Sequence, residues 1–112
     1  MDFFSVCEPM RGYRGSTIPI FRIPVTGMDL TGCSMEMLLE RRYTPGRIVF
    51  SKACAHYTSG DETGYTVQLT SADTAELSGA YTMYYVLTDS GGMKYYNLLG
   101  YIEFLDPPRE VT

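Results

Sequence analysis

Apolar and polar residues alternate along much of the chain. Every second residue from Cys33 to Leu39 is apolar, whereas Glu36 and Glu40 fall on the opposite side of that alternation. Because successive side chains of a β-strand point to opposite faces, the pattern predicts a strand with one buried face and one solvated face. Leu38 is then an apolar residue on the face that is otherwise polar.

The same reasoning predicts strands elsewhere. We expect two short strands over residues 47–51 and 65–69, and a long hairpin over 80–88 and 93–104. The hairpin turn is an Asp-Ser-Gly-Gly sequence, which is typical of tight turns because glycine accepts a positive φ. Gly100 lies in the middle of the last strand and predicts a bulge there.

Two stretches depart from simple alternation. Residues 17–25 are rich in β-branched side chains but contain two prolines, which predicts an edge strand interrupted near Phe21. Residues 70–77 have helical signals, with Thr70 or Ser71 as the N-cap, and are too short for more than a turn or two. We therefore expect a short crossover helix between strands.

The chain has 112 residues, which favours one domain with one core. Six or seven short strands, mostly antiparallel, with a turn about every ten residues are typical of a sandwich. We predict an all-β protein, an immunoglobulin-like antiparallel β-sandwich of about seven strands with one short crossover helix. We assign residues 1–13 to an N-terminal arm, 14–106 to the sandwich and 107–112 to a C-terminal tail.

The position of Tyr81 indicates which type of β-sandwich the chain forms. It follows the crossover and Gly79, and it stands two residues before the apolar Met83. Immunoglobulin-like domains have a corner tyrosine at such a place, with its ring in the core and its hydroxyl bonded back to the crossover backbone. An ordinary inward-facing strand tyrosine fits the pattern equally well. The inter-sheet disulfide and core tryptophan of antibody domains are absent from the sequence.

Composition and charge exclude several partner classes. The formal net charge is -4 and the basic residues are spread out, so we expect no nucleic-acid binding. No stretch is apolar enough for a membrane helix, and the first residues do not resemble a signal peptide, so we expect no membrane contact and a protein made in a cytoplasm. The three cysteines, Cys7, Cys33 and Cys54, match no disulfide framework and are expected to be reduced.

Candidate chemistry is sparse. Cys54 and the single histidine, His56, would share a strand face, and Cys7 or Cys33 would be needed to complete a metal site. Zinc sites usually have two close-spaced ligand pairs, and here there is one. No nucleophile stands beside a base, and no glycine-rich sequence has the setting of a phosphate loop. We expect no enzyme activity, no cofactor and no metal.

Aromatic residues gather in the last hairpin and mark a possible interface. Both faces of that hairpin have rings, and one face must be core. The rings on the other face either contact a protein, stack on sugars or merely cover the sandwich. Our candidate interface residues are Phe3, Phe4, Leu38, Tyr84, Tyr95, Tyr96 and Tyr101.

A run of short motifs resembles a known family. They are RGST at 14–17, MDLTGC at 28–33, VQLTSADTA at 67–75, LSGAY at 77–81 and TDSGG at 88–92. In this order they resemble the immunoglobulin-like N-terminal domains of baseplate upper proteins and related tail-attachment proteins of phages and prophages of Gram-positive bacteria. The chain departs from that pattern at Cys33, at Pro19 and Pro24, and at residues 54–57.

The resemblance implies a non-enzymatic structural or assembly protein of a phage or prophage virion, in a baseplate, tail or connector. Such a protein would be made in the bacterial cytoplasm and assembled into the virion. Its partners would be other virion proteins, and further copies of itself as a homo-oligomer. The alternative is a small carbohydrate-binding or adhesion module of a bacterial surface system, in which the tyrosine rings would stack on a glycan.

Overall fold

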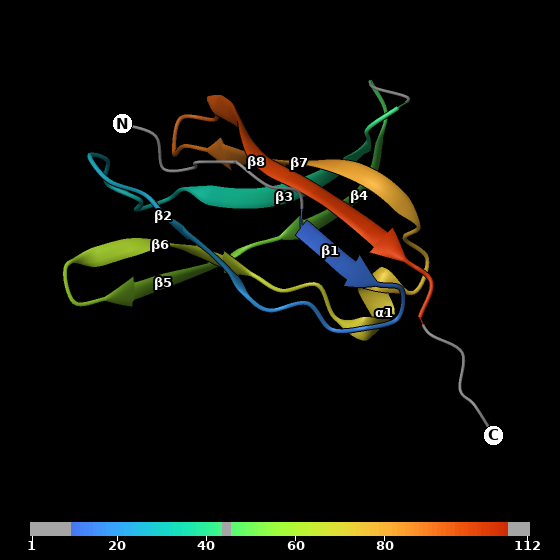
Figure 1. Cartoon of the computed structure of the whole chain (residues 1–112). Helices are drawn as coiled ribbons and strands as arrows, with labels where there is room; N and C mark the ends of the chain where they lie inside the picture. Colours follow the sequence, from blue (N-terminus) through green and yellow to red (C-terminus); the bar gives the residue numbers. More distant parts are fainter. Residues whose placement is uncertain (1–9, 44–45, 108–112) are drawn as a thin grey trace.

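The computed structural model describes residues 10–43 and 46–107, and within them the chain forms two β-sheets and one short helix (Figure 1). The larger sheet has five strands in the order β1-β8-β7-β3-β4, and the smaller has three in the order β2-β6-β5. The elements are β1 Met10–Tyr13, β2 Phe21–Pro24, β3 Ser34–Arg41, β4 Ile48–Ala53, β5 Ala55–Ser59, β6 Glu62–Val67, α1 Ser71–Thr74, β7 Gly79–Thr88 and β8 Lys94–Leu105. Phe3, Phe4 and Cys7 lie outside the described residues.

The strand order confirms the immunoglobulin-like β-sandwich. In the lettering of such domains, β2 to β8 correspond to strands B to G, so that one sheet is BED and the other contains C′CFG. β1 pairs in parallel with the outer edge of β8, whereas the other pairings are antiparallel. The last four residues of the predicted N-terminal arm, Met10–Tyr13, therefore belong to the five-stranded sheet.

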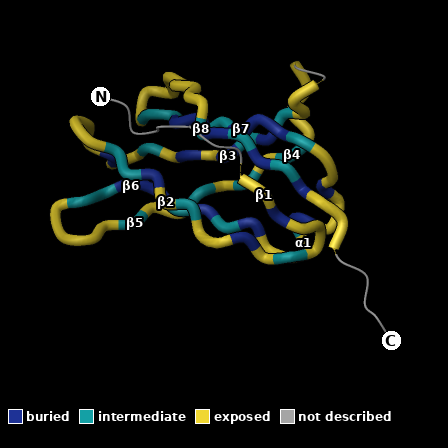
Figure 2. The backbone as a smooth tube through the Cα atoms, viewed as in Figure 1, coloured by how far each residue is buried: buried dark blue, intermediate teal, exposed yellow. Residues whose placement is uncertain are grey.

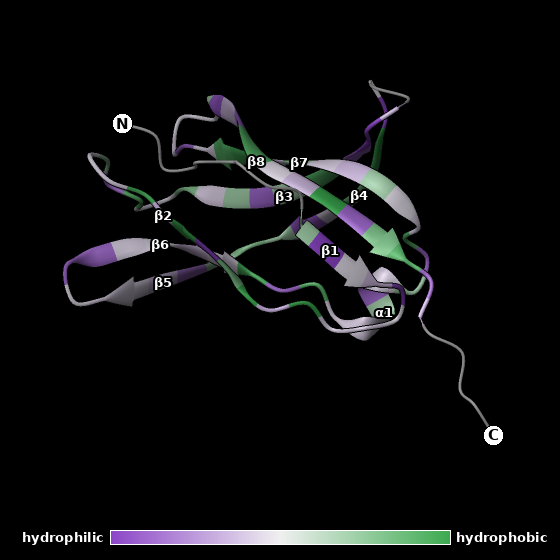
Figure 3. Ribbon diagram, in the orientation of Figure 1, coloured by the Kyte–Doolittle hydropathy of each residue, from purple (hydrophilic) through white to green (hydrophobic). Residues whose placement is uncertain are grey.

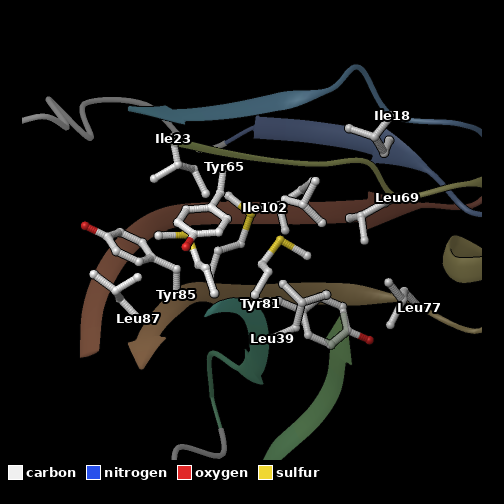
Figure 4. Close-up of a cluster of buried hydrophobic side chains, with 14 of the residues drawn as sticks. Ile18, Ile23, Leu39, Tyr65, Leu69, Leu77, Tyr81, Tyr85, Leu87 and Ile102 are labelled. Carbon is white, nitrogen blue, oxygen red and sulfur yellow. The ribbon is translucent and has the colours of Figure 1, made fainter. Parts of the chain in front are cut away.

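The core lies between the two sheets and follows the predicted alternation. Met35, Met37 and Leu39 of β3 are buried, as are the alternate residues of β7 from Tyr81 to Leu87. The three-stranded sheet adds residues such as Ile23 and Tyr65 from the opposite side (Figure 4). Burial is concentrated where the sheets overlap, and the tip of the β5–β6 hairpin is exposed (Figure 2).

β2 is an edge strand, as its prolines predicted, but it is shorter than residues 17–25 and is continuous from Phe21 rather than interrupted there. β2 begins only at Phe21, after Pro19, and ends at Pro24 on the outside of β6. β5 was not predicted, because the chain leaves β4 at Cys54 and enters the other sheet at once. The backbone N–H of Cys54 still bonds to the carbonyl of Met35, so this residue marks the crossing from one sheet to the other.

The crossover helix is a single turn. α1 is capped by Thr70, whose side chain accepts from the backbone of Asp73, while the Asp73 carboxylate accepts from the backbone of Thr70. This reciprocal capping box satisfies donors that a helix start leaves free. This single turn agrees with the prediction of a short crossover helix within residues 70–77, and the last of these residues form a turn that leads into β7.

Tyr81 has the geometry of a corner tyrosine. Its side chain is 1% exposed, and its ring packs edge-on against Phe104, with the ring centroids 5.9 Å apart. Its hydroxyl donates to the carbonyl of Ser78 at 2.9 Å and accepts from the Ser78 N–H at 3.0 Å. The residue thus joins the crossover backbone to the core.

Candidate interaction surface

The five-stranded sheet has an apolar centre on the side that faces away from the three-stranded sheet. Residues directly opposite each other in antiparallel strands share a face, so the register of β3, β7 and β8 places side chains in rows. We use the name outer face for nine residues in three such rows. The rows are Glu40, Thr82 and Tyr101; Leu38, Tyr84 and Leu98; and Glu36, Val86 and Tyr96.

This face is apolar where a solvated sheet would be polar. Val86 is only 6% exposed although it points away from the core, and Thr82, four residues earlier on the same side of β7, is also buried. Tyr96 is 63% exposed and Leu98 is 39% exposed on the neighbouring strand. Hydrophobic residues on β8 and β4 contrast with the paler and more polar β5 and β6 in Figure 3. An aromatic and aliphatic cluster of this kind is typical of a protein interface.

Two of its rings are held by polar partners. The hydroxyl of Tyr84 donates to Glu40 Oε1 at 3.2 Å, and Glu40 Oε2 accepts from the Gly46 N–H at 2.6 Å. Burial and the nearby Glu40 carboxylate raise the pKa of Tyr84 above its usual value, so its hydroxyl stays protonated as a donor. The guanidinium of Arg42 lies 4.5 Å from the centroid of the Tyr101 ring. These contacts therefore fix the orientation of the Tyr84 and Tyr101 rings in the unbound protein.

The structure brings together four of the seven residues that we predicted as interface candidates. Leu38, Tyr84, Tyr96 and Tyr101 share the outer face. Tyr95 does not: it stands opposite Leu87, on the core side of the sheet, and its hydroxyl lies 3.4 Å from Asp89 in the hairpin turn. Because a strand turns successive residues to opposite faces, Tyr95 and Tyr96 cannot belong to the same face.

The bulge in β8 decides which residues join the outer face. Tyr84 pairs with Leu98, whereas Thr82, two residues earlier, pairs with Tyr101, three residues later. Without the extra residue at this point, Leu98 and Tyr101 would point to opposite faces. Gly100 predicted the bulge, but only the strand register shows that it puts both side chains on one surface. Sequence reasoning did not identify Val86 and Leu98, since each is ordinary in a strand.

Cys33 and His56 line a pocket beside strands β5 and β6. This pocket of about 420 Å³ is lined by Cys33, His56 and Tyr65 among others. His56 Nε2 lies 3.0 Å from Thr63 Oγ1, and its ring meets Tyr65 edge-on. Within the described part of the chain, no three histidine, cysteine or acidic side chains are grouped to hold a metal ion.

Cys54 is not an activated nucleophile. Burial, together with the charge of Glu36, raises the pKa of its thiol to about 11. A reactive cysteine requires the opposite, because the thiolate is the attacking species. Cys54 is instead packed against the core at the crossing between the sheets.

No helix among residues 10–43 and 46–107 is long and apolar enough to cross a membrane. Comparison of the whole chain with protein-family models, with curated proteins and with solved structures found no match.

Proposed function

We propose that this protein is a non-enzymatic assembly component of a phage or prophage particle, in a baseplate, tail or connector, and that it binds a neighbouring protein through the outer face. The observation that carries the proposal is the row of Leu38, Tyr84 and Leu98, which crosses three adjacent strands without a charge. Burial of such an apolar row by a partner lowers the free energy, because it removes apolar surface from water. The particle itself is inferred from the resemblance of the motifs.

The fixed orientation of two rings on the outer face also favours a protein partner. Tyr84 and Tyr101 are already held by Glu40 and Arg42, so binding need not restrict these rings further. Ordering side chains at an interface costs about 0.5–1.5 kcal/mol for each flexible residue, and a prepared face avoids part of that cost. Tyrosine adds a large rigid surface with a hydroxyl at its end.

A carbohydrate partner is the second candidate, because the exposed Tyr96 ring offers a surface for stacking on a sugar. A sugar also needs free hydrogen-bonding groups around the ring. Here the Glu40 carboxylate is engaged by Tyr84 and by Gly46, and the neighbours of Tyr96 include the aliphatic Val86 and Leu98. The surroundings therefore favour protein over glycan.

The test uses the chromosomal copy of the coding sequence. Particles are induced from the wild-type strain and from strains with Tyr96→Asp or Leu98→Asp, then purified and analysed by mass spectrometry and electron microscopy. We expect the protein in wild-type particles, and loss of the protein or stalled assembly in both variants. Ile20→Asp is the matched control, since Ile20 is 60% exposed and directly precedes β2 of the other sheet.

Two results would overturn the proposal. One is complete particles that never contain this protein. The other is a glycan array on which the wild-type protein binds a sugar reproducibly and Tyr96→Ala does not, which would establish the carbohydrate-binding alternative.

A further inference from the structure

We propose that the outer face binds a second copy of this chain, in a dimer whose two-fold axis runs parallel to the strands. In this dimer β3 of each copy lies over β8 of the other. The inference rests on the proposed function, because it assigns an occupant to the same face.

The outer side of the sheet has the size that a dimer requires. Five strands about 4.8 Å apart, with an average of eight residues at about 3.4 Å each, cover roughly 650 Å² in projection, before the relief of the side chains is added. A standard stable interface removes about 800 Å² from each partner. The two values are close enough for this side alone to form a specific contact.

The axis follows from the placement of charge. Glu36 and Glu40 lie on β3, on one side of the outer face, and Lys94 lies on β8, on the other side, one row beyond Tyr96. Glu36 and Lys94 are both exposed, and neither forms an ion pair among the residues that the structure describes. On the outer side of the sheet, β3 therefore carries Glu36 and Glu40. On the same side, β8 carries Lys94 at one end and, at the other end, Glu103, which is already paired with Arg11 at 3.6 Å.

Two face-to-face arrangements of identical sheets are symmetric about a two-fold axis in the interface plane. An axis across the strands places β3 on β3, so that Glu36 of one copy meets Glu40 of the other. An axis along the strands places β3 over β8 row by row, so that Glu36 of each copy comes over Tyr96 of its partner, one row from the partner's Lys94. Like charges at an interface are costly, and opposite charges select the second arrangement.

The same axis matches the apolar row with itself. Leu38 on β3 comes over Leu98 on β8 of the second copy, and Tyr84 on the central strand comes over its own counterpart. Every contact then occurs twice, as in an isologous interface. Charge and apolar surface thus point to one geometry.

The test is a charge swap measured by sedimentation velocity and light scattering on the full chain, from about 10 μM to about 1 mM, which spans weak to moderate affinities. We expect the wild-type protein to reach twice the monomer mass. Glu36→Lys alone and Lys94→Glu alone each place like charges together twice per dimer, and should weaken it by about tenfold or more. An equimolar mixture of the two variants restores both attractive contacts and should dimerise again. The double variant Glu36→Lys with Lys94→Glu should also dimerise.

Asp61→Lys is the matched control, because Asp61 is an exposed acidic residue at the tip of the β5–β6 hairpin, in the other sheet. It should leave the dimer unchanged. A wild-type protein that stays monomeric at the highest concentration overturns the inference, and so does a mixture of the two single variants that fails to restore the dimer. If the protein is monomeric but Tyr96→Asp is still lost from particles, the face binds a different protein and the proposed function stands.

Discussion

The ammonium group of Lys52 lies 2.5 Å from the carboxylate of Asp73 and joins the edge strand β4 to the helix α1. Lys52 stands opposite Met37 in the register, so it points to the core side of the sheet. It also donates to the carbonyl of Gln68 at 2.7 Å. A charged residue that points inward from an edge strand discourages further strand addition, and here it also closes one open side of the sandwich.

Asp73 therefore has two roles in stability, as the ion-pair partner of Lys52 and as a member of the capping box. Asp73→Ala should lower the free energy of unfolding by about 1–2 kcal/mol, measured by urea denaturation. Glu76→Ala is the control, since Glu76 is exposed at the end of the same crossover. Equal effects of the two substitutions would contradict these roles.

The same carboxylate predicts an acid-dependent part of stability. Hydrogen bonds from Lys52 and from the Thr70 backbone hold the pKa of Asp73 below its usual value of 3.8. The ionised form is thus favoured in the folded state, so its contribution is present above about pH 4 and is lost as pH falls through the lowered pKa. The difference in unfolding free energy between wild type and Asp73→Asn should shrink between pH 6 and pH 2. A constant difference over that range would be evidence against this ion pair.

Gly64 is required by a close approach of two strands. A Cβ atom at this position of β6 would lie 2.2 Å from the carbonyl oxygen of Ile23 in β2. Gly64→Ala must displace the backbone of the edge strand, and we expect a loss of about 2–4 kcal/mol in thermal or urea unfolding. Gly91→Ala is the matched control, because a Cβ there meets nothing closer than 3.4 Å, and it should stay within about 0.5 kcal/mol of wild type.

The Tyr81 hydroxyl can be removed without changing the ring. Tyr81→Phe deletes both hydrogen bonds to Ser78 and keeps the contact with Phe104. We expect a loss of about 1–2 kcal/mol in unfolding free energy. Tyr43→Phe, at an exposed position, should change little. If neither substitution changed the unfolding free energy, the hydroxyl of Tyr81 would add no stability, and Tyr81 would be an ordinary buried tyrosine.

The raised pKa of Cys54 predicts slow alkylation. In a variant with Cys7→Ser and Cys33→Ser, the rate of reaction with iodoacetamide should rise with pH and reach half its limit near pH 11. In urea the midpoint should move toward the ordinary value of 9.0, because burial and the Glu36 charge no longer act on the thiol. A midpoint near 9 in the folded protein would contradict the buried environment of Cys54.

Local pattern was sufficient for the strands that form the core. Apolar and polar side chains alternate with period two over residues 33–40 and 80–88, and this alternation predicts which side chains face inward. The Asp-Ser-Gly-Gly turn likewise joins β7 to β8 as predicted, with the N–H of Asp89 bonded to the carbonyl of Met93. These features depend on residues that are close together in the chain, so they can be predicted from the sequence before the fold is known.

Tertiary structure decided the rest, because the remaining features depend on which strands lie side by side. Leu38 was recognised as outward-facing, but its row with Tyr84 and Leu98 exists only through the pairing of β3, β7 and β8. The parallel pairing of β1 and the shared face of Leu98 and Tyr101 across the predicted bulge have the same origin. A single sequence specifies the direction of each side chain along its own strand, whereas a surface is made by register between strands far apart in the chain.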